Sequence, residues 1–110
     1  DPAFSGAARR ITIPGGPLAG RGMISELRMA HIVAVTRLGT SRSVAGSCTH
    51  EPCTLGALAG ATLFWAEVGA NPRDTAEKTE EGRGTTVDHC AALFRETDWS
   101  TLNGPSLYFD

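Results

Sequence analysis

The sequence predicts a small, mostly β protein with antiparallel strands. Its 110 residues are the usual size of one domain. Its 13 glycines and 6 prolines favour many turns over long helices. A β-branched run from His31 to Leu38 ends at Gly39, and a polar turn then leads into a second short segment, residues 43–45. Strand, turn and strand at this length are typical of a β-hairpin.

The other elements are predicted from composition along the chain. Residues 1–22 are rich in Gly, Pro and Ala and predict an extended arm, in which Pro14 and Pro17 cannot donate to a strand ladder. Residues 23–110 predict a single domain. Within it, the polar and charged stretch at about 71–86 predicts an exposed insertion.

Charge and hydropathy exclude two classes of partner. The formal net charge is −2 and no run of basic residues occurs, so we expect no nucleic acid partner, which would need a concentrated positive face. The longest uncharged stretch, residues 52–66, is shorter than the roughly 18–20 apolar residues that cross a bilayer. We therefore expect no membrane-spanning segment.

The candidate functional residues are cysteines and histidines in two segments. They are Cys48, His50 and Cys53 in the first segment, and His89 and Cys90 in the second. Thiolate and imidazole groups bind borderline and soft metals. Since three cysteines are an odd number, at least one is free, metal-bound or paired with another chain. A metal or cluster site, a Cys53–Cys90 disulfide without metal, and inert buried cysteines all remain open.

One of these segments resembles a known motif. Cys48-Thr49-His50-Glu51-Pro52-Cys53 resembles the first cluster-binding box of the Rieske iron–sulfur proteins. The predicted hairpin before it and the Gly104-Pro105 turn are also similar to that family. The resemblance implies a Rieske-like antiparallel β-sandwich with a cluster-binding loop subdomain. It also implies a [2Fe–2S] cluster, with Cys48 as a thiolate ligand and His50 as an imidazole ligand.

The second segment departs from the family pattern. That pattern is Cys-x-x-His, whereas this chain reads His89-Cys90-Ala91-Ala92-Leu93, with Leu93 at the histidine position if Cys90 is a ligand. If His89 is the second imidazole ligand, the set again has two cysteines and two histidines, but the histidine precedes the cysteine instead of following it. Cys53 matches the cysteine that forms a loop-linking disulfide in one branch of the family.

The resemblance implies electron transfer through a Rieske-type [2Fe–2S] centre. The chain would be a small ferredoxin or an oxidoreductase subunit with a redox protein partner, rather than a self-sufficient enzyme. The implied cluster ligands are Cys48, His50, Cys90 and His89.

Two alternatives stay open. One is a non-redox accessory or interaction subunit of a larger complex, which has a structural protein partner and no cofactor. The other is a zinc-stabilised binding module with a Cys3His site. Its ligands would be Cys48, Cys53, Cys90 and either His50 or His89.

Overall fold

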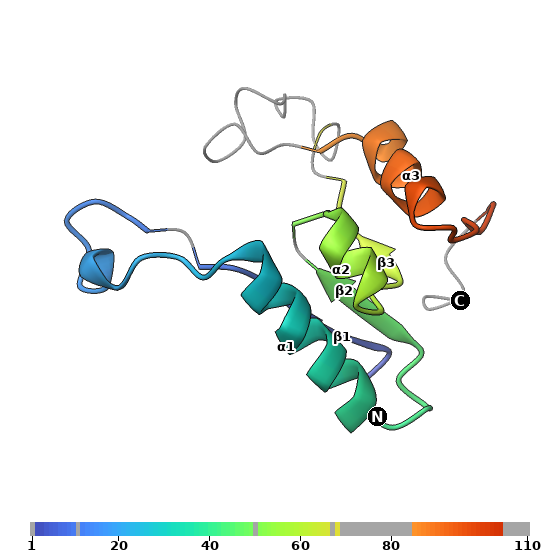
Figure 1. Ribbon diagram of the computed structural model, residues 1–110, viewed down its shortest axis with the longest axis horizontal. Coiled ribbons are helices and arrows are strands. Elements are labelled where there is room, and N and C mark those ends of the chain that lie inside the picture. The colour runs from blue at the N-terminus through green and yellow to red at the C-terminus, as the bar shows by residue number, and fades with distance from the viewer. Residues whose placement is uncertain (1, 11, 50, 67, 69–84, 105–110) are drawn as a thin grey trace.

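The computed structural model describes residues 2–10, 12–49, 51–66, 68 and 85–104 (Figure 1). The elements in chain order are β1 (Phe4–Ala7), the 3-10 helix η1 (Ala19–Arg21), α1 (Glu26–Gly39), β2 (Gly46–Thr49), α2 (Thr54–Leu58), β3 (Leu63–Phe64) and α3 (Val87–Glu96). The predicted charged insertion, at about 71–86, lies almost entirely outside the described residues.

The strands form a parallel sheet in the order β1-β2-β3. Phe4 pairs with Gly46 at one end of the register, and Thr49 pairs with Phe64 at the other. A helix lies between each pair of consecutive strands, which is the connection that parallel strands require. All four residues of β2 are buried, so this central strand carries the core of the sheet.

The predicted mostly β, antiparallel, Rieske-like sandwich is wrong. The described residues contain three α-helices and a three-stranded sheet in which every pairing is parallel. The run from His31 to Leu38, predicted as the first strand of a hairpin, lies inside α1. An apolar run of this length is compatible with either a buried strand or a buried helix, because its periodicity alone does not separate them.

Local interactions at both ends favour a helix at α1. The Ser25 side chain accepts a hydrogen bond from the backbone N–H of Arg28, which caps the first turn. Glu26 in the first turn and Arg37 in the last turn complement the helix dipole. The β-branched residues between them lower helix propensity by less than about 1 kcal/mol each, which burial of one face offsets.

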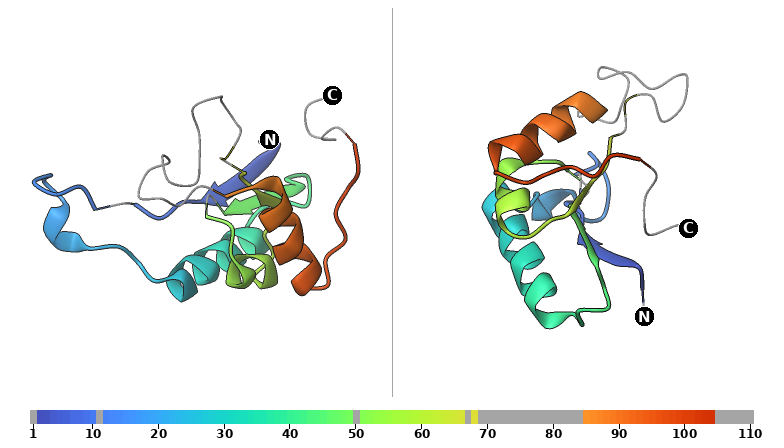
Figure 2. Two further views of the ribbon diagram at one scale, coloured as in Figure 1. Left: turned by 90° about the horizontal axis from the view of Figure 1, so that it is seen from above. Right: turned by 90° about the vertical axis from the view of Figure 1, so that its right-hand side faces the viewer.

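All three α-helices lie on one face of the sheet (Figure 2). The side chains of Met29 and Val33 in α1 are fully buried. Phe94 of α3 stacks on Phe64 of β3, with ring centroids 4.3 Å apart. The Trp99 indole N–H donates to the Ala57 carbonyl at 3.2 Å and thereby joins the end of α3 to α2. The helical layer is therefore held together from α1 through α2 to α3.

The opposite face of the sheet is bridged by two aromatic rings. Phe4 of β1 and Trp65, just after β3, meet edge to face with centroids 6.3 Å apart. Since β2 lies between β1 and β3, this pair spans the central strand. Together with the helical layer, it leaves β2 shielded on both sides.

The predicted N-terminal arm contributes β1 and then extends away from the sheet as a loop (Figure 1). Arg9 forms an ion pair with Glu51 near the end of β2, and Arg10 donates to the Gly22 carbonyl at 2.7 Å. The ion pair ties the start of the loop to the end of β2, and the hydrogen bond joins the two ends of the loop to each other. No α-helix of the described residues is long and apolar enough to cross a membrane, in agreement with the prediction.

Candidate functional site

Cys48 lies in the buried centre of β2, on the face of the sheet that has no α-helix. It pairs in register with Gly6 of β1 and Leu63 of β3. A side chain at Gly6 would overlap the Cys48 sulfur, so the sulfur occupies the space that this glycine leaves open. The thiol is therefore enclosed by its two neighbouring strands.

Cys53 lies on the opposite, helical side of the sheet. Its sulfur accepts a hydrogen bond from the backbone N–H of Gly56 at 3.3 Å, so Cys53 is the N-cap of α2. A Cβ atom at Gly56 would lie 2.7 Å from Thr49 Cγ2 and 3.2 Å from Cys53 Sγ, which puts these two side chains together. Successive strand residues point to opposite faces, so Thr49 and Cys53 lie on one side and Cys48 on the other.

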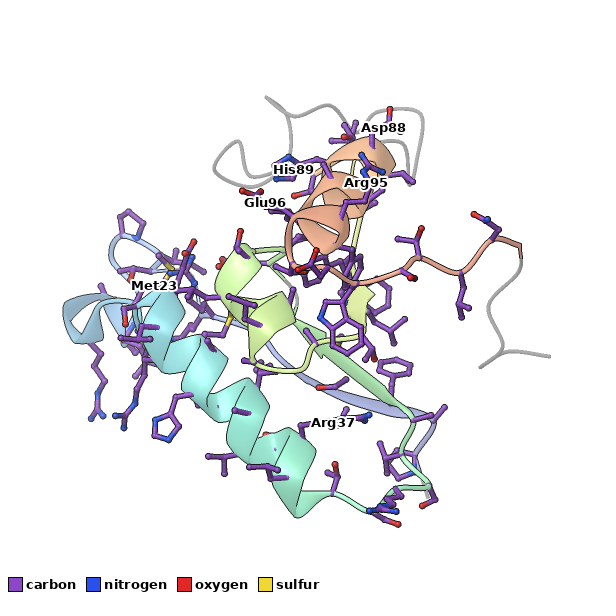
Figure 3. All side chains as sticks on the ribbon, turned by 45° about the vertical axis from the view of Figure 1, so that its right-hand side comes forward. Met23, Arg37, Asp88, His89, Arg95 and Glu96 are labelled. Atoms are coloured by element: carbon purple, nitrogen blue, oxygen red, sulfur yellow. The ribbon has the colours of Figure 1, made fainter. Side chains whose placement is uncertain are left out.

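Cys90 lies in α3, where its sulfur is 3.9 Å from the Trp65 carbonyl oxygen. His89 precedes it, and its backbone N–H donates to the Thr86 hydroxyl, which caps the helix. Cys90 is buried whereas His89 is exposed. Figure 3 shows His89 and Asp88 projecting from different sides of the beginning of α3, away from the strands. The two adjacent side chains thus occupy different environments.

Burial disfavours the thiolate form of two of the cysteines at neutral pH. Removal from water raises the pKa of Cys53, an effect that its hydrogen bond from Gly56 only partly opposes. Removal from water likewise raises the pKa of Cys90. The thiolate is the form that attacks electrophiles and binds metals. Both groups therefore stay as neutral thiols over the physiological range.

The described residues contain no group of three or more His, Cys, Asp or Glu side chains arranged to hold a metal ion. All three cysteines are free thiols in the structure. His50, a predicted imidazole ligand, lies outside the described residues. The ligand sets for a [2Fe–2S] cluster and for zinc therefore stay predictions. Two cysteines of the zinc set, Cys48 and Cys53, lie on opposite sides of the sheet.

The structure reveals a second candidate site that the sequence interpretation missed, on the outer surface of α1. Met29, Ala30 and Val33 of this helix are buried. On the opposite side, the side chains of Leu27, Val35 and Leu38 are 69%, 58% and 87% exposed. Apolar side chains thus occur on both sides of α1, and exposed apolar residues gathered on one helix face mark a candidate contact surface. The sequence signal for this site is the set of apolar residues within 26–39. These residues divide into a buried and an exposed face only when the segment is interpreted as a helix.

An open groove runs beside this apolar surface, between α1 and the end of α2. It encloses about 570 Å³. Ala30, Ala34 and Ala59 line it with small side chains, and Leu27 and Arg28 line it as well. Small side chains allow a further backbone to approach the helices closely, so the groove can receive an elongated apolar ligand.

Comparison with known proteins identifies no relative: no family model, no curated protein and no solved structure matches the chain. What the fold and these surfaces define is a small α/β protein with a three-stranded parallel sheet, an apolar helix exposed on one side and three buried free thiols.

Proposed function

We propose that this chain is a non-redox interaction subunit, which binds another protein through the outer surface of α1. The exposed apolar side of α1 is the observation that carries this proposal. Leu27, Val35 and Leu38 recur at intervals of eight and three residues, which places them on one side of the helix. Contact with water is unfavourable for each of them, by about 1.5–3 kcal/mol for a fully exposed side chain relative to a buried one.

The thiols support the same proposal over electron transfer. A Rieske-type centre needs two thiolates and two imidazoles around one cluster. Among the implied cluster ligands, Cys48 lies on the face of the sheet that has no α-helix, whereas His89 and Cys90 lie on α3 in the helical layer. In an interaction subunit the cysteines have packing and capping roles, for which neutral thiols are suited.

Site-specific photo-crosslinking tests the proposal. A photoreactive amino acid replaces Leu38, and the variant is expressed in the organism that makes the protein. The matched control carries the same amino acid at Ser100, which is exposed but distant from α1 in the sequence. We expect one discrete adduct with another protein from position 38 and none from position 100. Equal labelling at both positions, or no adduct at either, would contradict the proposal.

Metal analysis of the purified protein separates the proposal from its competitors. We expect protein without stoichiometric metal, whose circular dichroism spectrum is unchanged by a chelator. Iron with acid-labile sulfide would instead support the [2Fe–2S] prediction, and stoichiometric zinc would support the zinc-stabilised module. Either metal result would overturn the non-redox, metal-free assignment.

A further inference from the structure

We infer that the groove between α1 and α2 binds an amphipathic helix of a partner protein, one that carries carboxylates beside its apolar face. The inference rests on the proposed function and specifies the partner's chemistry. It follows from three properties of the groove: its small-residue lining, its exposed apolar side chain Leu27 and its charge.

The lining suits a helix. Ala30 and Ala34 are one turn apart on α1, and Ala59 at the end of α2 lies across from them in the same groove. Side chains of a docked helix can enter the space above these alanines, as ridges of one helix enter grooves of another. The exposed Leu27, which also lines the groove, provides the apolar contact that anchors such a helix.

The charge of the groove indicates carboxylates on the partner. Arg28 and His31 line it, and none of its lining residues is acidic. Arg28 has no ion-pair partner among the residues that the structure describes. Over residues 8–40 the sequence contains five arginines and one glutamate, Glu26, which gives this segment a formal charge of +4 against −2 for the whole chain. A carboxylate on the docked helix would pair with the Arg28 guanidinium.

The same charges argue against a second copy of this chain as the occupant. Another α1 would bring its own Arg28 and His31 to a surface that already carries both. The exposed side of α3 offers polar residues such as Asp88 and Glu96, but its buried Cys90 and its stacked Phe94 face the chain's own core. Of these two helices, α1 brings one carboxylate, Glu26, together with Arg28 and Arg37, and α3 brings its carboxylates with Val87 as its one exposed large apolar side chain.

A membrane surface is also a poorer fit than a protein helix. A helix that lies in a lipid interface has one strongly polar face and one apolar face. In α1 apolar residues occur on both sides, with Met29 and Val33 buried against the sheet and Leu27 and Leu38 outward. This distribution is that of a helix placed between two protein layers.

Fluorescence anisotropy with a synthetic peptide tests the inference. The probe is a labelled helical peptide of about 18 residues, five turns long, with leucines along one face and glutamates beside them. The matched probe has lysine in place of every glutamate. We expect the glutamate peptide to bind the full chain at least ~10-fold more tightly than the lysine peptide, and added salt to reduce this difference.

Two matched variants locate the binding site. Leu27 and Val87 are each 69% exposed, but only Leu27 lines the groove. We expect Leu27→Asp to weaken binding of the glutamate peptide at least ~10-fold and Val87→Asp to leave it unchanged. Arg28→Glu is expected to reverse the preference between the two peptides, and circular dichroism checks that each variant is folded.

Several outcomes would overturn the inference. They are equal binding of the two peptides, equal effects of Leu27→Asp and Val87→Asp, binding to phosphatidylserine vesicles but to neither peptide, and a concentration-dependent dimer in sedimentation that Leu27→Asp abolishes. The proposed function is judged separately by the crosslink from position 38. An adduct at position 38 without peptide binding would support the proposed interaction subunit but contradict an acidic helix as its partner.

Discussion

Cys53 and Cys90 contribute to the structure through neutral sulfur atoms. The Cys53 sulfur accepts the N-cap hydrogen bond of α2, and the Cys90 thiol packs against the Trp65 carbonyl. Burial raises the pKa of both thiols above the ordinary value of 9.0. The folded protein consequently holds both protons to a higher pH than the unfolded chain does.

This difference predicts an alkaline loss of stability. Well below pH 9 both states bind the two protons, so the thiols make no pH-dependent contribution there. As the pH rises through and above 9, the unfolded chain loses its thiol protons first, and the free energy of unfolding decreases until the folded thiols also ionise. Urea unfolding at pH 7.5 and pH 10 measures the decrease.

The control for this prediction is the double variant Cys53→Ser, Cys90→Ala. It retains a capping side chain at position 53 and a good helix former at position 90. Its free energy of unfolding should fall less between the two pH values than that of the unchanged protein. An equal decrease in both proteins would show that other groups, and not these thiols, cause the pH dependence.

At the scale of the element, the end of α3 has a specific hydrogen-bond pattern. The backbone N–H of Trp99 donates to the Phe94 carbonyl at 2.9 Å. The backbone N–H of Asp98 donates to the Arg95 carbonyl at 3.1 Å. These two bonds are those of a Schellman motif, which requires a left-handed residue just after the helix. Asp98 occupies that position with a φ of 60°. The left-handed conformation is costly for a residue other than glycine.

We therefore expect Asp98→Gly to increase the free energy of unfolding by about 0.5–1 kcal/mol. Glycine adopts a positive φ without steric cost, and the backbone hydrogen bonds of the motif remain. Asp98→Ala is the matched control, because it removes the same carboxylate but keeps a Cβ atom. Urea unfolding at neutral pH compares the variants. An alanine variant as stable as the glycine variant would contradict the role assigned to backbone conformation.

At the scale of the whole molecule, α3 is attached to the sheet and to α2 by side chains near its C-terminal end. Phe94 stacks on Phe64 of β3, and Trp99 donates to the Ala57 carbonyl of α2. The helix is amphipathic, with Cys90 buried and Asp88, Arg95 and Glu96 exposed (Figure 3). A short isolated helix is marginal in water, so these tertiary contacts determine whether α3 persists.

Phe94→Ala is accordingly expected to release α3 before the rest of the fold. A fully buried phenylalanine costs about 3–5 kcal/mol on truncation to alanine, and the half-buried Phe94 should cost roughly half of that. Hydrogen–deuterium exchange measures the local effect, with faster exchange expected at residues 87–96 than at residues 29–39. Phe94→Leu retains apolar contact and should show a smaller effect. Uniformly faster exchange over both helices would contradict local release.

The sequence by itself determined several local features of this protein. An element does end at Gly39, where the sequence placed the end of a strand, although the element is the helix α1; glycine and the polar residues after it terminate either kind of element. The longest uncharged stretch, residues 52–66, is too short to cross a bilayer, and no helix of the described residues is long and apolar enough to do so. The end of an element and the length of an uncharged stretch depend only on residues that are adjacent in the chain, so the sequence is sufficient to predict them.

Only the tertiary structure decided the type of α1 and the pairing of the strands. Residues 31–38 fit a buried strand or a buried helix equally, and the buried positions of Met29 and Val33 against the sheet distinguish the two. The parallel pairing of Phe4 with Gly46 joins residues far apart in the chain, where no local pattern specifies register. It also sets which side of the sheet Cys48 faces, and so separates two cysteines that the sequence places five residues apart.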